Sequence, residues 1–151
     1  MSIKTVQDDV ADAVARALMS SRSDAIIAAD RDGAITFWNE GAERIFGHPQ
    51  EAVLGKSLDV IIPERLRRRH ADGYRRVMGG RQSRYGEADV LAVPALRRDG
   101  TTISVEFTIV PMRDVQGSLM GLIAVIRDVT RQFEELRALR RRVSELATGP
   151  G

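Results

Sequence analysis

The fold of this chain is decided by the stretch Ala25-Ile26-Ile27-Ala28-Ala29-Asp30-Arg31-Asp32-Gly33-Ala34-Ile35-Thr36-Phe37-Trp38-Asn39. Its first five residues predict a buried strand, and residues 34–39 predict a second strand. Between the two, residues 30–33 have the composition of a tight turn. The stretch therefore predicts a β-hairpin in which Trp38 lies in the core and Phe37 at its rim.

Short helices follow this hairpin. Residues 40–46 predict a helix that ends at Gly47, because glycine favours the backbone conformation that ends a helix. His48-Pro49 begins a turn, and we expect His48 at the surface. Residues 50–54 predict one more helical turn.

The second half of the chain predicts mainly strands. Residues 87–96, 101–112 and 119–126 predict three strands joined by turns, which form an antiparallel meander. Pro94 is expected at a sheet edge or a bulge, because proline has no N–H for a neighbouring strand. Since the helices lie between two groups of strands, we predict an α+β fold with an antiparallel sheet and helices on one face.

A longer helix is predicted over residues 65–78, opened by Pro63 and stopped by Gly79-Gly80. Its spacing places Leu66, His70, Tyr74 and Val77 on one face, away from most of its arginines. One imidazole thus lies within an apolar stripe, in a chain that has two histidines. His70 is the candidate functional side chain.

Amphipathic helices are predicted at both ends of the chain. Residues 3–20 carry the stripe Ile3, Val6, Val10, Val14 and Leu18. Residues 130–147, with Thr130 as the N-cap, carry the coiled-coil spacing Leu136, Leu139, Val143 and Leu146. Each stripe needs another surface to cover it, either the domain or a second copy of the chain, and we expect a homodimer. We divide the chain into a terminal helix at 1–21, a domain at 22–130 and a second helix at 131–151.

Composition excludes several classes of protein. The 151 residues contain no cysteine, so there is no disulfide, thiolate metal site or cysteine nucleophile. No apolar run is long enough to cross a bilayer and no signal peptide is evident, which predicts a cytoplasmic protein. The net charge of +2 gives little reason to expect a nucleic-acid partner. No spacing of side chains indicates catalysis, and we predict no enzyme.

Six motifs occur in order along the chain: Ser23-Asp24-Ala25-Ile26-Ile27-Ala28-Ala29-Asp30-Arg31-Asp32-Gly33, Phe37-Trp38-Asn39, Ala42-Glu43-Arg44-Ile45-Phe46-Gly47, Val53-Leu54-Gly55-Lys56, Arg98-Asp99-Gly100 and Arg127-Asp128-Val129-Thr130. Together they resemble a PAS sensor domain over residues 22–130. The resemblance implies a PAS fold, in which a five-stranded antiparallel sheet carries short helices on one face and a pocket beneath them. It also implies that the C-terminal helix carries the signal outward.

Within this family, Ile62-Pro63-Glu64 followed by His70, Tyr74 and Arg76 is similar to the helix of the rhizobial-type haem oxygen sensors. The resemblance implies that haem b binds with His70 as the iron ligand, with Tyr74 in the same site. It implies that Arg76, and Arg84 as a second candidate, pair with haem propionates. Phe107 and Ile109 match apolar residues that wall the distal side. Gly86-Glu87-Ala88-Asp89 departs from the pattern, since those sensors have an arginine there.

Three hypotheses follow from these residues. The first is a haem sensor of a diatomic gas or of redox state, with output through the C-terminal helix to a protein effector or to an output domain beyond this chain. The second is a cofactor-free interaction module that dimerises through the terminal helices, with His70 as an ordinary core histidine. The third is a receptor for another small ligand, such as a flavin, a carboxylate or a lipid-like molecule. The cysteine-linked chromophores of PAS-related photoreceptors are excluded.

Overall fold

A computed structural model describes residues 5–80 and 92–149 of the chain. Its elements, in order, are α1 (Val6–Met19), β1 (Ala25–Asp30), β2 (Ile35–Trp38), α2 (Glu40–Phe46), α3 (Gln50–Val53), the 3₁₀ turns η1 (Leu58–Ile61) and η2 (Glu64–Leu66), α4 (Arg67–Met78), β3 (Val93–Leu96), β4 (Thr102–Arg113), β5 (Leu119–Asp128) and α5 (Thr130–Ala147). The succession of two strands, short helices, three strands and a final helix is the predicted one.

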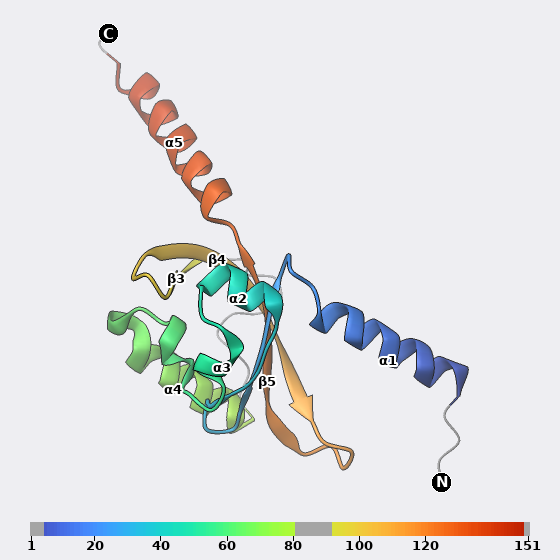
Figure 1. Cartoon of the computed structure of the whole chain (residues 1–151). Helices are drawn as coiled ribbons and strands as arrows, with labels where there is room; N and C mark the ends of the chain where they lie inside the picture. Colours follow the sequence, from blue (N-terminus) through green and yellow to red (C-terminus); the bar gives the residue numbers. More distant parts are fainter. Residues whose placement is uncertain (1–4, 81–91, 150–151) are drawn as a thin grey trace.

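The five strands form one antiparallel sheet in the order β2-β1-β5-β4-β3. Helices α2, α3 and α4 lie on one face of this sheet (Figure 1). Trp38 and Phe46 are the largest side chains buried between the helices and the sheet, with ring centroids 5.6 Å apart. Phe37 is half-buried at the rim, as predicted. The predicted α+β fold is confirmed.

The hairpin forms because Asp30 closes its turn. The Asp30 Oδ1 atom accepts hydrogen bonds from the backbone N–H groups of Asp32 (2.9 Å) and Ala34 (3.0 Å). Gly33 adopts φ +82°, the left-handed region that glycine enters without a steric penalty. Asn39, predicted as the last residue of the second strand, is instead the N-cap of α2.

Two predicted boundaries change around the long helix and the edge strand. Residues 64–66 form a 3₁₀ turn, with Leu66 N donating to Pro63 O at 2.8 Å, so the α-helix begins at Arg67 and not at Arg65. β3 is an edge strand that contains Pro94, as expected. The earlier part of the predicted strand 87–96 falls largely outside the described residues.

The prediction of Thr130 as an N-cap is wrong. Thr130 is the first residue of α5, and the residue before it, Val129, makes no side-chain cap bond. The Thr130 hydroxyl accepts a hydrogen bond from Ser104 N (3.0 Å) and donates to Asp128 Oδ1 (2.5 Å). Because the hydroxyl is engaged with β4 and with the end of β5, it fixes the start of α5 to the sheet and is not available as a cap.

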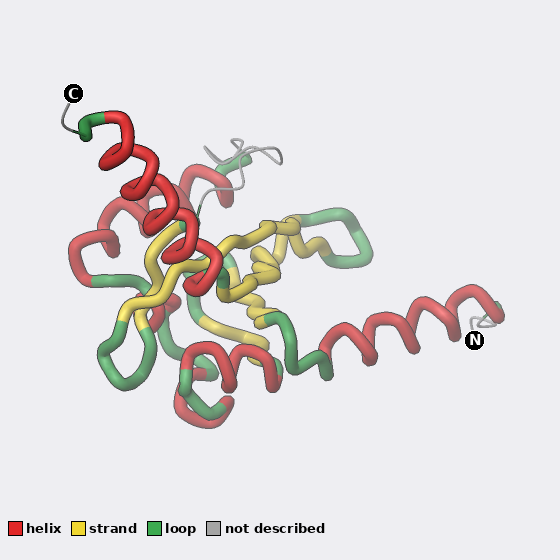
Figure 2. Tube along the Cα trace, turned by 90° about the horizontal axis from the view of Figure 1, so that it is seen from above, coloured by secondary structure: helices red, strands yellow, loops and turns green. Residues whose placement is uncertain are grey.

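Both terminal helices project from the body formed by the sheet and its helices (Figures 1 and 2). The predicted apolar stripes are exposed on both. On α1 the exposed fractions are 81% for Val6, 57% for Val10, 52% for Val14 and 58% for Leu18, and on α5 they are 47% for Leu136, 57% for Leu139, 66% for Val143 and 84% for Leu146. Ile3, which completes the first stripe, lies outside the described residues. Among the described helices, none combines the length and apolar character needed to span a bilayer.

Candidate functional site

His70 lies on the face of α4 that is turned toward the sheet. Leu66, Tyr74 and Val77 on the same face are half-buried, whereas Arg69 and Arg76 are exposed. Burial lowers the pKa of His70, and the negative charge of Asp59 opposes that shift. The lowered pKa favours the neutral imidazole, which is the form that can coordinate a metal.

Tyr74 fastens the same helix face to the sheet. Its hydroxyl donates a hydrogen bond to the carbonyl oxygen of Asp30, the last residue of β1. Burial, together with the negative charge of Asp30, raises the pKa of Tyr74 to about 12. The Tyr74 ring is tilted against His70, with centroids 6.2 Å apart. Tyr74 therefore holds α4 against the end of β1, close to His70.

We expect the Tyr74 hydrogen bond to make the stability of the fold pH-dependent in the alkaline range. The pKa of Tyr74 rises from 10.0 to about 12 on folding, so the contribution of the phenol is complete below pH 10 and is lost as the pH rises through about 12. Tyr74→Phe removes the hydrogen bond and is expected to cost about 1 kcal/mol at neutral pH. Urea unfolding of both proteins between pH 8 and 12 measures this, and the two stabilities are expected to converge at the alkaline end. A constant difference would contradict the assignment.

Phe107 and Ile109 lie on the sheet face that is covered by the helices. They continue the face of Ile103 and Val105 along β4, because residues two apart on a strand share a face, and Phe107 pairs with Ile126 while Ile109 pairs with Ala124 of β5. Ile103 and Val105 are buried, but Phe107 and Ile109 are only partly buried. Val60, Ile62 and Ala124 are likewise only partly covered at the edge of the core. An apolar surface beside the core is thus incompletely covered.

Of the two predicted propionate partners, Arg76 falls within the described residues. Arg76 is exposed, since it follows His70 by six residues and is therefore about a third of a turn away around the helix. Arg84 lies outside the described residues. Arg67, which sequence reasoning did not single out, donates from Nε to the carbonyl oxygen of Ile62 at 3.1 Å. This bond links the start of α4 to the residue that precedes Pro63.

The second histidine is not a simple surface residue. The backbone oxygen of His48 accepts the Trp38 Nε1 hydrogen bond at 3.0 Å, and the side chain of His48 is half-buried. Its Nε2 atom is buried and has no hydrogen-bond partner among the described residues. Burial, with Arg98 and Lys56 nearby, lowers its pKa. The expected surface position of His48 is thus found only in part, because the Trp38 indole holds the backbone of this turn against the core.

A family model described as the PAS fold matches residues 19–134. The chain belongs to the PAS family. This PAS chain is 35% identical over 133 residues to an uncharacterised protein of Azorhizobium caulinodans, covering 87% of this chain and 18% of the relative. It is 28% identical over 138 residues to the sensor protein FixL of Bradyrhizobium diazoefficiens, covering 87% and 25%. It is 25% identical over 138 residues to the oxygen sensor protein DosP of Escherichia coli, covering 89% and 17%.

These relatives are much longer, since the PAS chain spans between 17% and 25% of their lengths. Among solved structures, the PAS domain of a protein from Colwellia psychrerythraea matches 82% of the chain and 99% of its own length, with a TM-score of 0.65 and 22% identity. An RNA-binding light-oxygen-voltage receptor matches 95% of the chain and 40% of its own, with a TM-score of 0.68 and 20% identity. At these identities the structures establish the fold alone.

Proposed function

We propose that this sensory PAS domain binds haem b through His70 and responds to a diatomic gas or to redox state. In this proposal residues 22–130 form the sensor and residues 131–151 carry its output, either to a protein effector or to an output domain beyond this chain. Residues 1–21 contribute to a homodimer. The proposal assigns no catalysis to the chain.

The observation that carries the proposal is the state of His70. A half-buried imidazole on the inner face of α4, whose lowered pKa favours the neutral form, can give one nitrogen to iron. His70 is the chain's single ligand in this proposal, which would leave bound iron free to take a gas molecule. Bound haem would supply an iron centre that binds gases and exchanges one electron.

The surrounding residues are compatible with haem in their chemistry. Phe107 and Ile109 present apolar surface that the helices leave partly uncovered. A flat macrocycle would cover this surface, and the two side chains would exclude water from it. Arg76 is exposed on the same helix, where its guanidinium would pair with a carboxylate at the rim. Tyr74 would hold α4 in place beside the ring. The segment that departs from the oxygen sensors, residues 86–89, lies outside the described residues.

The relatives support a sensor but differ in what their names imply. DosP is named an oxygen sensor, and one structural neighbour is named a light-oxygen-voltage receptor. Another neighbour is a light-oxygen-voltage domain described with a flavin analogue. A test of haem binding must therefore also distinguish haem from a flavin. Such a flavin would be held without a covalent bond, since the chain has no cysteine for the linked form.

Replacing His70 is the direct test. We expect the purified protein with added haemin to have a Soret band that shifts on reduction and again with carbon monoxide. His70→Ala is expected to lose that band, or to weaken haem binding at least tenfold, because the iron loses its protein ligand.

His48→Ala is the matched control, because it removes the chain's other histidine. It is expected to keep the full spectrum. Equal haem binding by His70→Ala and the unaltered protein would overturn the assignment. A protein that refuses haemin but carries a yellow ligand absorbing near 450 nm would point to a flavin.

The exposed stripes on α1 and α5 favour a second candidate, a cofactor-free interaction module. Val10 and Val14 are 57% and 52% exposed on a helix whose residues are exposed, apart from the half-buried Asp12. Exposure of these apolar side chains to water is unfavourable. Packing against a second copy of the chain would remove them from water. This module would dimerise with or without a ligand.

A charged substitution on α1 tests the dimer. The unaltered chain is expected to be a dimer at micromolar concentration, and the double variant Val10→Glu/Val14→Glu is expected to dissociate, with Kd rising at least tenfold because carboxylates cannot be buried unpaired. Light scattering after size exclusion measures the mass. Arg16→Glu makes the same change of two charge units on the opposite, exposed face of the helix, and is expected to remain dimeric. Monomeric unaltered protein would refute this use of α1.

A further inference from the structure

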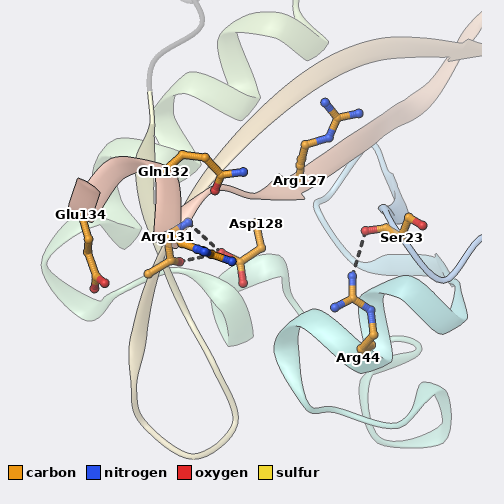
Figure 3. A pocket seen from close by; sticks show the side chains of 8 residues that line it. Ser23, Arg44, Arg127, Asp128, Arg131, Gln132 and Glu134 are labelled. Atoms are coloured by element: carbon orange, nitrogen blue, oxygen red, sulfur yellow. Dashed lines mark hydrogen bonds between the residues drawn. The ribbon is translucent and has the colours of Figure 1, made fainter. Parts of the chain in front are cut away.

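A second site lies at the junction between the sheet and α5, away from His70. It is a surface pocket of about 390 Å³ lined by three arginines, Arg44 of α2, Arg127 of β5 and Arg131 of α5, together with Asp128, Thr130 and Glu134 (Figure 3). Small-molecule sites in proteins start at about 300 Å³. The pocket is therefore large enough for a small organic ion.

Each of the three arginines makes a hydrogen bond or an ion pair, but these contacts do not use all of its N–H donors. Arg44 donates from Nε to Arg22 O at 2.7 Å and from Nη2 to Ser23 O at 2.9 Å, and the second of these bonds is drawn in Figure 3. Arg127 approaches Asp24 with Nε at 3.4 Å, and Arg131 pairs with Glu135 at 3.2 Å. Each guanidinium has five N–H donors, so these bonds leave donors for an oxyanion.

The acidic residues of the lining do not neutralise these arginines. Asp128 Oδ1 already accepts hydrogen bonds from Thr130 N (3.0 Å) and Thr130 Oγ1 (2.5 Å). Glu134 points away from Arg44 and Arg127 in Figure 3. Three guanidinium groups against two carboxylates leave a formal charge of +1 on the lining. Asp24 and Glu135, which pair with Arg127 and Arg131, lie outside this lining, so a bound anion would compete with two exposed ion pairs that contribute little in water.

We propose that this pocket binds a small dianion through carboxylate or phosphate oxygens, and that the bound anion fixes the direction of α5. Arg131 lies in the first turn of α5, whereas Arg44 and Arg127 belong to the body. Residues 131–147 of α5 are exposed. An anion that bridges the three arginines adds a contact beyond the Thr130 hydrogen bonds at the start of that helix. This site is independent of haem and would operate in either proposed function.

Titration of the isotope-labelled full chain with succinate, and separately with inorganic pyrophosphate, tests the proposal by NMR at constant ionic strength. For at least one anion we expect saturable shifts centred on residues 23, 44 and 127–132, with a Kd below about 1 mM. Binding of succinate alone identifies a carboxylate ligand, binding of pyrophosphate alone a phosphate ligand, and binding of both a general oxyanion site. Shifts that potassium chloride reproduces, or that do not saturate, overturn the proposal.

Variants locate the binding. Arg127→Gln and Arg131→Gln each remove one guanidinium from an exposed side chain, and each is expected to weaken the anion at least tenfold. Arg142→Gln removes the same charge farther along α5 and is expected to leave the Kd unchanged. Equal weakening by Arg142→Gln would mean general charge attraction and would overturn the site. The spectra themselves report whether each variant is folded.

Discussion

Replacing Asn39 with alanine is expected to destabilise the domain by about 3–5 kcal/mol. The side chain is 4% exposed and makes four hydrogen bonds. Its Oδ1 atom accepts from Ile26 N (2.8 Å) and Ala42 N (2.9 Å), and its Nδ2 atom donates to Ser21 O (3.0 Å) and Asp24 O (3.1 Å). Alanine would leave these backbone groups without partners in a poorly hydrated place, which costs more than the bonds themselves contribute.

Ser57→Ala is the matched control, because Ser57 also caps a short helix. Its Oγ atom accepts from Asp59 N at 3.1 Å in an exposed position. Its loss is expected to cost about 0.5–1 kcal/mol, since water replaces the missing acceptor. Urea unfolding gives both values. If Asn39→Ala costs no more than Ser57→Ala, Asn39 does not hold the start of β1 and α2 together.

Gly121→Ala is expected to be the second severe substitution, at about 3 kcal/mol or more. A Cβ atom on Gly121 would lie 1.9 Å from the carbonyl oxygen of Ala29 and 3.0 Å from the Cα atom of Asp30. Both are backbone atoms of β1, which pairs with β5 at this point. A clash with a side chain could be relieved by rotation of that side chain. This clash is with the backbone, so β1 and β5 would have to move apart.

Gly73→Ala in α4 controls for the change of residue itself. A Cβ atom there meets nothing within 4 Å, and alanine is the better helix former by about 0.5–1 kcal/mol. We expect Gly73→Ala to match or exceed the unaltered protein in thermal unfolding, while Gly121→Ala melts far lower. Similar melting temperatures for the two variants would contradict the close approach of β5 to β1.

Features with a local cause were predictable. The hairpin followed from an acidic turn between two apolar runs, and the inward face of α4 followed from the spacing of Leu66, His70 and Tyr74. Both patterns depend on residues that are close in sequence. The exposed stripes on α1 and α5 followed for the same reason, because each helix has one apolar face.

Features that depend on distant contacts were missed. Three of the four hydrogen bonds of the Asn39 side chain go to residues 13 to 18 positions away, and the Tyr74 hydroxyl bonds to a residue 44 positions away. Only the packed sheet brings those partners together. The position of Asn39 just before a helix is a capping signal and could have indicated part of its role. Arg44 and Arg127 are separated by most of the domain, and no spacing rule connects them.

The attachment of α5 gives the molecule a mechanical property. The helix has 18 residues and is therefore about 27 Å long, and Thr130 holds one end of it against β4. A tilt of about 10° at that end displaces the other end by roughly 5 Å, close to one helical turn. A rearrangement too small to repack the sheet would thus change which residues of a neighbouring helix the far end of α5 meets. If α5 carries the output as proposed, the helix would therefore amplify a small tilt at its base into a larger displacement at its far end.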